Sequence, residues 1–143
     1  MGEYHPSLDD KGRIAVPVRL RKAFDEHELI SRLIVTYGFG KYIMAYREQD
    51  WDDFVKTKLI SASGSGPDGA AMVRYFVGGA ADCELDKQGR IIIPQHLKEH
   101  SGISREVTVL GLYNRIEIWD SEEYNRHKPS GESLKSLAKD LGF

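Results

Sequence analysis

Short runs in which apolar and other side chains alternate are the main pattern along this chain. In the run 13–16, Ile14 and Val16 fall on one face and the leading arginine falls on the other, and the run 90–93 has the same alternation. Period-two alternation of β-branched residues favours strands that are buried on one face. The pattern therefore predicts two short, half-buried strands of matching design.

Longer apolar runs predict two further strand pairs and two short helices. The strand pairs are 33–37 with 42–46, turning at Gly38, and 107–110 with 115–119, turning at Gly111. A short helix is expected between each early strand and the pair that follows it. In the first helix Leu20, Ala23 and Phe24 would share the inner face. Gly102 is expected to end the second helix.

The chain contains an internal repeat, which gives this order of elements twice. Residues 8–20 align with residues 85–97, and seven of the thirteen positions are identical, where composition alone would give about one. The repeat predicts a first unit at 5–51, a helical and Gly/Ser-rich connection at 52–81, a second unit at 82–124 and a partly helical tail at 125–143. A unit of this size is too small to fold alone. We therefore expect residues 1–124 to form one compact, β-rich domain, all-β to α+β, with internal pseudo-twofold symmetry.

A tight turn precedes each of the two short strands. Asp at the start of such a turn bonds its own backbone, and Gly at the end accepts a positive φ. A proline that follows the strand fits the first turn of a short helix. The positions expected to be structural for these reasons are Asp9, Gly12, Asp86, Gly89, Pro17 and Pro94.

Composition excludes several classes of protein. The 143 residues are 41% hydrophobic and 29% charged, and no apolar run reaches the roughly 20 residues of a transmembrane helix. The polar N-terminal segment lacks the apolar core of a secretion signal. A single cysteine excludes an internal disulfide framework and fits a reducing cytoplasm. We therefore expect a globular domain with no membrane contact.

The net charge of −2 does not suggest a nucleic-acid-binding protein, but the charge is unevenly distributed. Residues 1–24 carry five Lys and Arg against three Asp and Glu, a net charge of +2. Residues 25–53 carry three basic against seven acidic residues, a net charge of −4. The first segment is therefore where we expect a polyanion to bind.

Asp-x-x-Gly-Arg followed by apolar residues, a proline and a short helix resembles the AbrB/SpoVT swapped-hairpin superfamily. Two such copies, with Gly-x-x-x-x-x-Glu-Ile-Trp at 111–119, resemble the MraZ family within it. The resemblance implies a double swapped-hairpin β-barrel and sequence-specific binding of double-stranded DNA at short promoter repeats. It also implies a ring-shaped homo-oligomer, associated with the nucleoid in the cytoplasm, that represses the division and cell-wall gene cluster. It implies no cofactor, no metal, no small-molecule substrate and no enzymatic activity.

The resemblance also assigns candidate DNA-binding residues. Arg13 and Arg90 stand at the motif arginine in the two units, and a two-stranded ribbon tipped by arginine can enter the major groove, where guanidinium pairs with guanine. Basic residues beside the ribbon can hold phosphates, with salt-sensitive affinity. The full set of candidates is Arg13, Arg90, Lys11, Arg19, Arg21, Lys22, Lys87 and Lys98. The second unit has Glu99 where the first has Lys22, so the two units need not contribute equally.

Each of these assignments has a structural alternative. Arg13 and Arg90 each lie four residues after an aspartate, so an ion pair across the turn would also explain them. The basic residues of the first helix could form an ordinary solvated face. At the level of function, the alternative is a protein-interaction scaffold or an antitoxin-like binder on the same fold. Antitoxins of this type carry one unit and a long acidic arm, unlike this chain.

Other motifs favour structural roles. Gly64–Gly69 matches Gly-x-Gly-x-x-Gly but follows no strand, so a flexible linker is expected there instead of a nucleotide site. His96 and His100 have metal-pair spacing without a third ligand, and Cys83 is expected to be a small buried residue. The aromatics at matched repeat positions are expected in the core or an interface: Tyr46, Trp51, Trp119 and Tyr124. In the tail, Leu134, Leu137 and Leu141 share a helical face that is expected to pack on the domain or on a neighbouring subunit.

Overall fold

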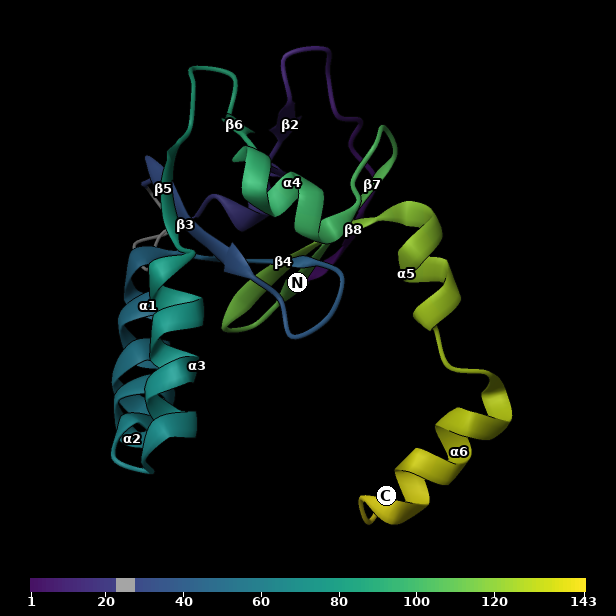
Figure 1. Ribbon diagram of the computed structural model, residues 1–143. Helices are drawn as coiled ribbons and strands as arrows, with labels where there is room; N and C mark the ends of the chain where they lie inside the picture. Colours follow the sequence, from purple (N-terminus) through teal and green to yellow (C-terminus); the bar gives the residue numbers. More distant parts are fainter. Residues whose placement is uncertain (23–27) are drawn as a thin grey trace.

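The computed structural model describes residues 1–22 and 28–143, in which eight strands form two antiparallel sheets. The larger sheet has the strand order β1-β7-β8-β4-β3-β5. Its strands are β1 (Gly2–Tyr4), β3 (Arg32–Tyr37), β4 (Ile43–Tyr46), β5 (Ala81–Glu84), β7 (Val107–Leu112) and β8 (Arg115–Asp120). The smaller sheet pairs β2 (Arg13–Ala15) with β6 (Arg90–Ile92) and lies above the larger one in Figure 1. The predicted β-rich, α+β class is confirmed.

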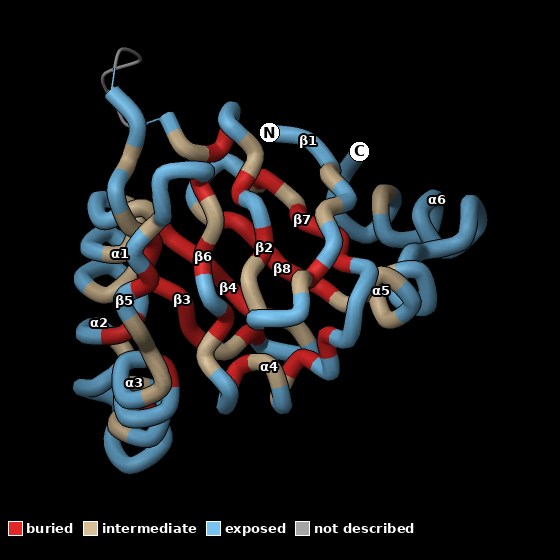
Figure 2. Tube along the Cα trace, turned by 90° about the horizontal axis from the view of Figure 1, so that it is seen from above, coloured by how far each residue is buried: buried red, intermediate tan, exposed pale blue. Residues whose placement is uncertain are grey.

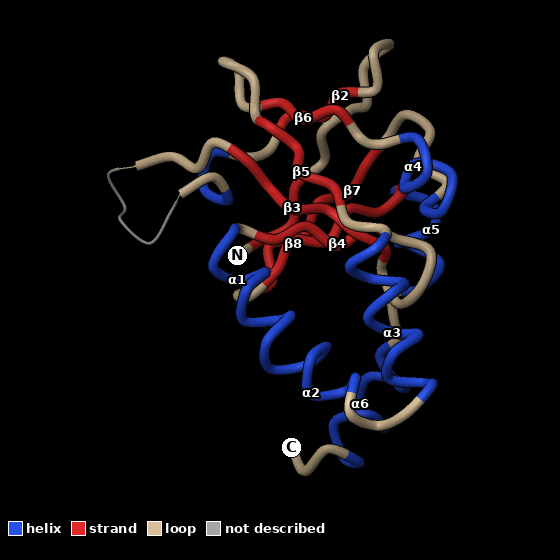
Figure 3. The backbone as a smooth tube through the Cα atoms, turned by 60° about the vertical axis from the view of Figure 1, so that its left-hand side comes forward, coloured by secondary structure: helices blue, strands red, loops and turns tan. Residues whose placement is uncertain are grey.

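Helices lie at the sides of these sheets and below them (Figure 1). They are η1 (Val18–Leu20), α1 (Glu48–Phe54), η2 (Val55–Leu59), α2 (Ile60–Ser63), α3 (Pro67–Gly78), α4 (Gln95–Ser101), α5 (Ser121–His127) and α6 (Gly131–Asp140). The elements α1, η2 and α2 follow one another without a break, and α3 returns beside them to form a helical hairpin, seen from its side in Figure 3.

The two sequence repeats are interlocked by backbone hydrogen bonds. The N–H of Val16 donates to the carbonyl of Gly89 at 2.9 Å, and the N–H of Ile93 donates to the carbonyl of Gly12 at 3.0 Å. These bonds flank the β2–β6 pair, in which Ile14 lies opposite Ile91. The short strand of each unit therefore completes its pairing only with the other unit.

The larger sheet repeats the same symmetry at its centre. Strands β4 and β8 occupy equivalent places in the two units and pair directly, with Met44 opposite Glu117. Ile43 lies opposite Ile118, and Ala45 lies opposite Ile116, so equivalent positions exchange places across the pair. One pseudo-twofold axis therefore relates both strand pairs.

The main core lies between the two sheets, where the inner faces of both units meet. Figure 2 shows the buried segments concentrated along β2, β6 and the middle strands of the larger sheet. Leu33, Ile91 and Leu97 are completely buried there, and Ile14 is 1% exposed. A second, smaller cluster lies on the opposite face of the larger sheet, under the helical hairpin: Met44, Tyr46, Leu59 and Phe76.

The predicted turn at Gly111 is wrong. Gly111 lies inside β7, and the β7–β8 turn consists of Tyr113 and Asn114, because Leu112 pairs with Arg115. Tyr113 takes a φ of 48°, which side chains other than Gly and Asn seldom adopt. Gly111 is instead explained by close packing, since a Cβ at this position would meet Leu20 Cδ2 at 2.5 Å.

The first predicted helix is much shorter than expected. The described part is one 3₁₀ turn, η1, with Pro17 in extended conformation as its N-cap. Lys22 already forms an isolated β-bridge with Leu29. Ala23 and Phe24, predicted on the inner helix face, lie outside the described residues. In the second unit α4 ends at Gly102 in left-handed conformation, as predicted.

The Gly/Ser-rich segment is not the extended linker that its composition suggests. Residues Ile60–Ser63 form α2 and α3 begins at Pro67, so only a tight turn separates the two helices. Pro67 fits there because the first helical position needs no N–H donor. Over the ranges 1–22 and 28–143, each helix is too short or too polar to span a bilayer.

Candidate nucleic-acid interface

The turns that precede β2 and β6 project side by side from one end of the molecule (Figure 1). The helical hairpin lies at the other end, as Figure 3 also shows. Gly12 and Gly89 both adopt a φ of 75°, which closes each turn in a conformation that a residue with a Cβ rarely takes. The repeat therefore places two equivalent turns on one common face.

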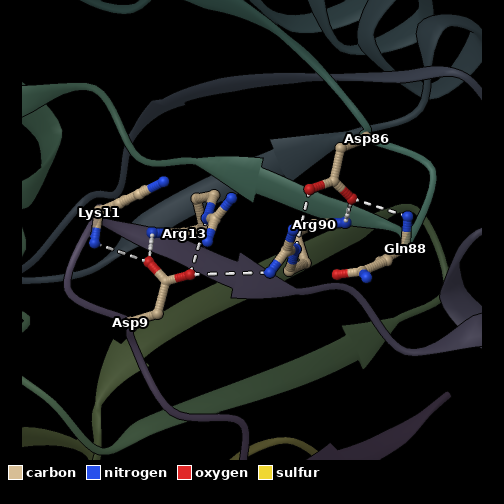
Figure 4. A network of polar contacts seen from close by, with 6 residues as sticks. All are labelled: Asp9, Lys11, Arg13, Asp86, Gln88 and Arg90. Carbon is tan, nitrogen blue, oxygen red and sulfur yellow. Dashed lines mark hydrogen bonds and ion pairs between the residues drawn. The ribbon is translucent and has the colours of Figure 1, made fainter.

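An aspartate organises each turn in the same way (Figure 4). Asp9 Oδ1 accepts from the backbone N–H groups of Lys11 at 2.9 Å and Arg13 at 2.8 Å. Asp86 Oδ1 accepts from Gln88 and Arg90, both at 2.9 Å. The four turn residues predicted from the sequence, Asp and Gly in each unit, thus have defined structural roles.

The second oxygen of each aspartate holds the arginine that begins the strand. Arg13 Nε donates to Asp9 Oδ2 at 2.7 Å, and Arg90 Nε donates to Asp86 Oδ2 at 2.8 Å. Arg90 Nη1 also lies 3.9 Å from Asp9 Oδ2, which links the two turns. The ion pairs of the structural alternative therefore exist, and they fix the direction of both guanidinium groups.

These ion pairs leave the ends of the arginines open to an outside acceptor. The side chains of Arg13 and Arg90 are 25% and 29% exposed. Within the described part of the chain, no hydrogen bond uses the Nη atoms of either residue. Each guanidinium can therefore present two parallel N–H donors, which is the geometry of a bidentate contact.

The outer face of the β2–β6 ribbon contains a residue that the sequence-based candidates omit. Ile92 lies opposite Arg13 in the register and is 62% exposed, although its neighbours Ile91 and Ile93 are buried. Ala15 occupies the equivalent place opposite Arg90 and is also exposed. The alternation in the sequence already places Ile92 on the arginine side, so that pattern could have identified it.

The same hydrogen bonds shift the acid–base properties of the turns. The N–H of Arg13 is the main cause that lowers the pKa of Asp9 below its ordinary value, and the Arg13 side chain adds to it against a small effect of burial. The N–H of Arg90 lowers the pKa of Asp86 in the same way. Both turns therefore favour the ionised carboxylate.

Acidification is expected to weaken both turns. Because the pKa of each aspartate is lower in the folded protein, its contribution to stability is complete above the unfolded pKa of about 3.9 and is lost as pH falls through the folded value. Carbon-13 NMR of the carboxyl groups of Asp9 and Asp86 should show titration below that value. In a double Asp-to-Asn variant, the free energy of unfolding should fall less between pH 6 and pH 3 than in the wild type. Titration of both carboxyls at or above pH 4 would contradict this account.

The remaining basic candidates are not all gathered at the ribbon. Lys11 and Lys87 lie in the two turns and are exposed, as expected. Arg21 does not lie on an outward helix face: it is half-buried, and its Nε donates to the carbonyl of Val16 at 3.0 Å. Its guanidinium packs against Gly89, where a Cβ would lie 2.4 Å from Arg21 Cζ. Arg21 of the first unit therefore supports the turn of the second.

Three other basic candidates occupy separate places. Arg19 is exposed and lines a cavity of about 170 Å³ with Arg47 and Arg115. Lys22 is exposed just after η1, and its carbonyl accepts from Arg47 at 3.1 Å. Lys98 is half-buried in α4. The structure thus brings together the two arginines, the two turn lysines and Arg21, and no described contact joins the other candidates to them.

Residues set aside in the sequence have ordinary structural surroundings. His96 and His100 each contact a backbone carbonyl through Nε2, that of Gly79 at 2.9 Å and that of Gly40 at 2.8 Å. Cys83 is buried, as predicted, and burial raises the pKa of its thiol to about 11. Tyr46 with Trp51 and Trp119 with Tyr124 form equivalent aromatic pairs in the two units, with ring centroids 5.6 and 5.5 Å apart.

Fold and site together define a class: a two-unit β-rich protein whose interlocked repeats present a pair of arginines on one ribbon. Comparison with known proteins identifies the family. The model of the family described as "MraZ protein, putative antitoxin-like" matches residues 1–74 and 76–139, so the chain belongs to the MraZ family. It is also similar to a protein of Desulforamulus reducens named "Transcriptional regulator MraZ". The two are 38% identical over 142 residues, which cover 99% of this chain and 96% of that protein.

Proposed function

We propose that this protein is a transcriptional regulator that binds double-stranded DNA in a sequence-specific manner through the β2–β6 ribbon. The observation that carries this proposal is the pair of equivalent, half-exposed arginines, Arg13 and Arg90, each held by an aspartate with its Nη atoms unused within the described residues. The name of the Desulforamulus relative supports the role in transcription.

The ribbon can enter the major groove because two antiparallel strands match its width. There the Nη donors of Arg13 and Arg90 pair with O6 and N7 of guanine, and Ile92 packs against the bases between them, where a thymine methyl would offer apolar contact. Lys11 and Lys87, in the exposed turns, contact the phosphates on either side. Base contacts would thus supply specificity, and the turn lysines would supply most of the salt-dependent affinity.

The finer features of this function follow the family resemblance. We propose that the interlocked units form a double swapped-hairpin barrel, and that copies of the chain assemble into a ring in the cytoplasm, associated with the nucleoid. Several ribbons facing repeated promoter sites would raise the avidity by roughly a hundredfold or more. The proposed effect is repression of the division and cell-wall gene cluster, with no cofactor, no small-molecule substrate and no catalysis.

The description of the matched family as antitoxin-like favours a second candidate, a protein-binding role on the same scaffold. The net charge of −2 is compatible with it. A pull-down with the full chain separates the two functions. A stoichiometric protein partner, recovered without DNA, would favour the second candidate over the first.

Selection of bound duplexes from random DNA, at two salt concentrations, tests the proposed function most directly. We expect one short motif, rich in G·C pairs where the arginines bind, to be enriched as a direct repeat. Binding should weaken at the higher salt concentration because phosphate contacts release counterions. The proposal fails if no motif is enriched at either concentration.

A further inference from the structure

Helix α6 is amphipathic, yet no part of its own chain covers its apolar face. Leu134, Leu137 and Leu141 follow one side of the helix and are 56%, 51% and 73% exposed. In the segment 131–143 every residue is exposed except the half-buried Ala138. A stripe of leucines left in water costs free energy that burial against a partner would recover.

The junction with α5 holds α6 away from the domain (Figure 1). Lys128 is extended, as expected before a proline, and Pro129 fixes its own φ. Ser130 is the N-cap of α6, and its Oγ accepts from the N–H of Ser133 at 3.1 Å. This short and well-capped connection projects the apolar stripe outward.

A groove of matching character lies between the helical hairpin and the lower face of the larger sheet. Its volume is about 460 Å³, and its apolar lining includes Phe39, Met44, Phe54, Leu59 and Met72. Phe39 and Met72 are 65% and 38% exposed, and they also line an adjoining cavity of about 580 Å³ over α3. The two cavities together form one apolar surface.

The charges beside the stripe complement those beside the groove. Lys135 and Lys139, one turn apart, follow one edge of the leucine stripe on α6. Asp50 and Asp53 belong to the wall that α1 gives the groove. A helix that lays its leucines in the groove can therefore place its lysines beside the two aspartates.

From these observations we propose that α6 of one chain docks in the groove of a second copy. Figures 1 and 2 place α6 and the helical hairpin at opposite sides of the molecule, which favours the groove of another chain over its own. Such a contact joins two different surfaces, so it continues from copy to copy and closes into a ring when the rotation allows. The inference deepens the proposed self-association and is independent of DNA binding.

Disulfide trapping between two differently tagged chains tests the contact. One chain carries Leu137→Cys and the other carries Met72→Cys, and the natural Cys83 is 6% exposed and buried in the core. We expect a mixed dimer on a non-reducing gel. Ser136→Cys, on the opposite side of α6, should give at least about tenfold less product with the same partner. A chain carrying both Leu137→Cys and Met72→Cys that cross-links only within itself would overturn the proposal.

A pair of charged variants tests the same contact in solution. Leu137→Glu should raise the apparent dissociation constant of self-association at least about tenfold, and Ser136→Glu should change it less than about twofold. Sedimentation velocity of the full chain measures both. If the wild type assembles and Leu137→Glu assembles equally well, the α6 contact is wrong although the proposed ring stands. A wild type that stays monomeric overturns the α6 contact and the ring together, and leaves DNA binding to its own test.

Discussion

Replacing both ribbon arginines, Arg13→Ala together with Arg90→Ala, is expected to abolish sequence-specific DNA binding while the protein stays folded. A bidentate guanidinium–guanine contact contributes about 1–3 kcal/mol of discrimination, so each single variant should lose about fivefold to 150-fold in affinity for the selected motif. The double variant should bind that motif no better than random duplex DNA. The fold should survive because exposed ion pairs such as those with Asp9 and Asp86 contribute at most about 1 kcal/mol each.

Fluorescence anisotropy with the selected duplex measures this loss. Arg126→Ala is the matched control, since it removes an exposed arginine that pairs with Glu123 on α5, away from the ribbon. Arg13→Lys adds a second control, because lysine keeps the charge but cannot form the two parallel bonds. Unchanged affinity in the double variant, with the far-UV circular dichroism of the wild type, would rule out the ribbon as the DNA-binding surface.

The second large effect is expected on stability, from the interface at which the two units interlock. Ile91 is completely buried opposite Ile14, at the centre of the β2–β6 pair. Ile91→Ala removes this contact and leaves a cavity that both units line. Truncations of this kind lower the free energy of unfolding by about 2–5 kcal/mol. Because neither unit can complete its strand pairing alone, we expect both to unfold in one transition.

The neighbouring residue in the same strand provides the control. Ile92 is 62% exposed, so Ile92→Ala should change the free energy of unfolding by less than about 1 kcal/mol. Urea titrations followed by tryptophan fluorescence and by circular dichroism give both values. Two separate transitions in the Ile91→Ala variant, or equal effects of the two substitutions, would show that the units are not interdependent.

The faces of the short strands could be predicted because alternation is local. Ile14 and Ile91 are 1% and 0% exposed, and the arginine that precedes each of them lies on the outer face. The structural roles of Asp9 and Asp86 were equally accessible, since an Asx turn involves residues only two to four positions apart. The sequence left open whether the arginines pair with these aspartates or face a ligand, and their geometry accommodates both.

The features that the sequence did not predict depend on distant contacts or on rare conformations. Nothing near Arg21 indicates that its side chain supports Gly89, because the two residues meet only after the units interlock. The turn at Tyr113 escaped prediction because tyrosine seldom takes a positive φ, whereas the nearby Gly111 resembles a turn residue. The apolar stripe of α6 was predicted, but a helical pattern alone does not tell which surface covers it.

The interlocking of two units within one chain also has a consequence for direction. A scaffold assembled from two identical chains must present identical halves, so any duplex lying across it meets a palindromic surface. Here the halves are covalently fused and have diverged: Lys22 in one corresponds to Glu99 in the other, and Ala15 corresponds to Ile92. A duplex bound across the ribbon would therefore have a head and a tail, and consecutive sites would have to run in the same orientation.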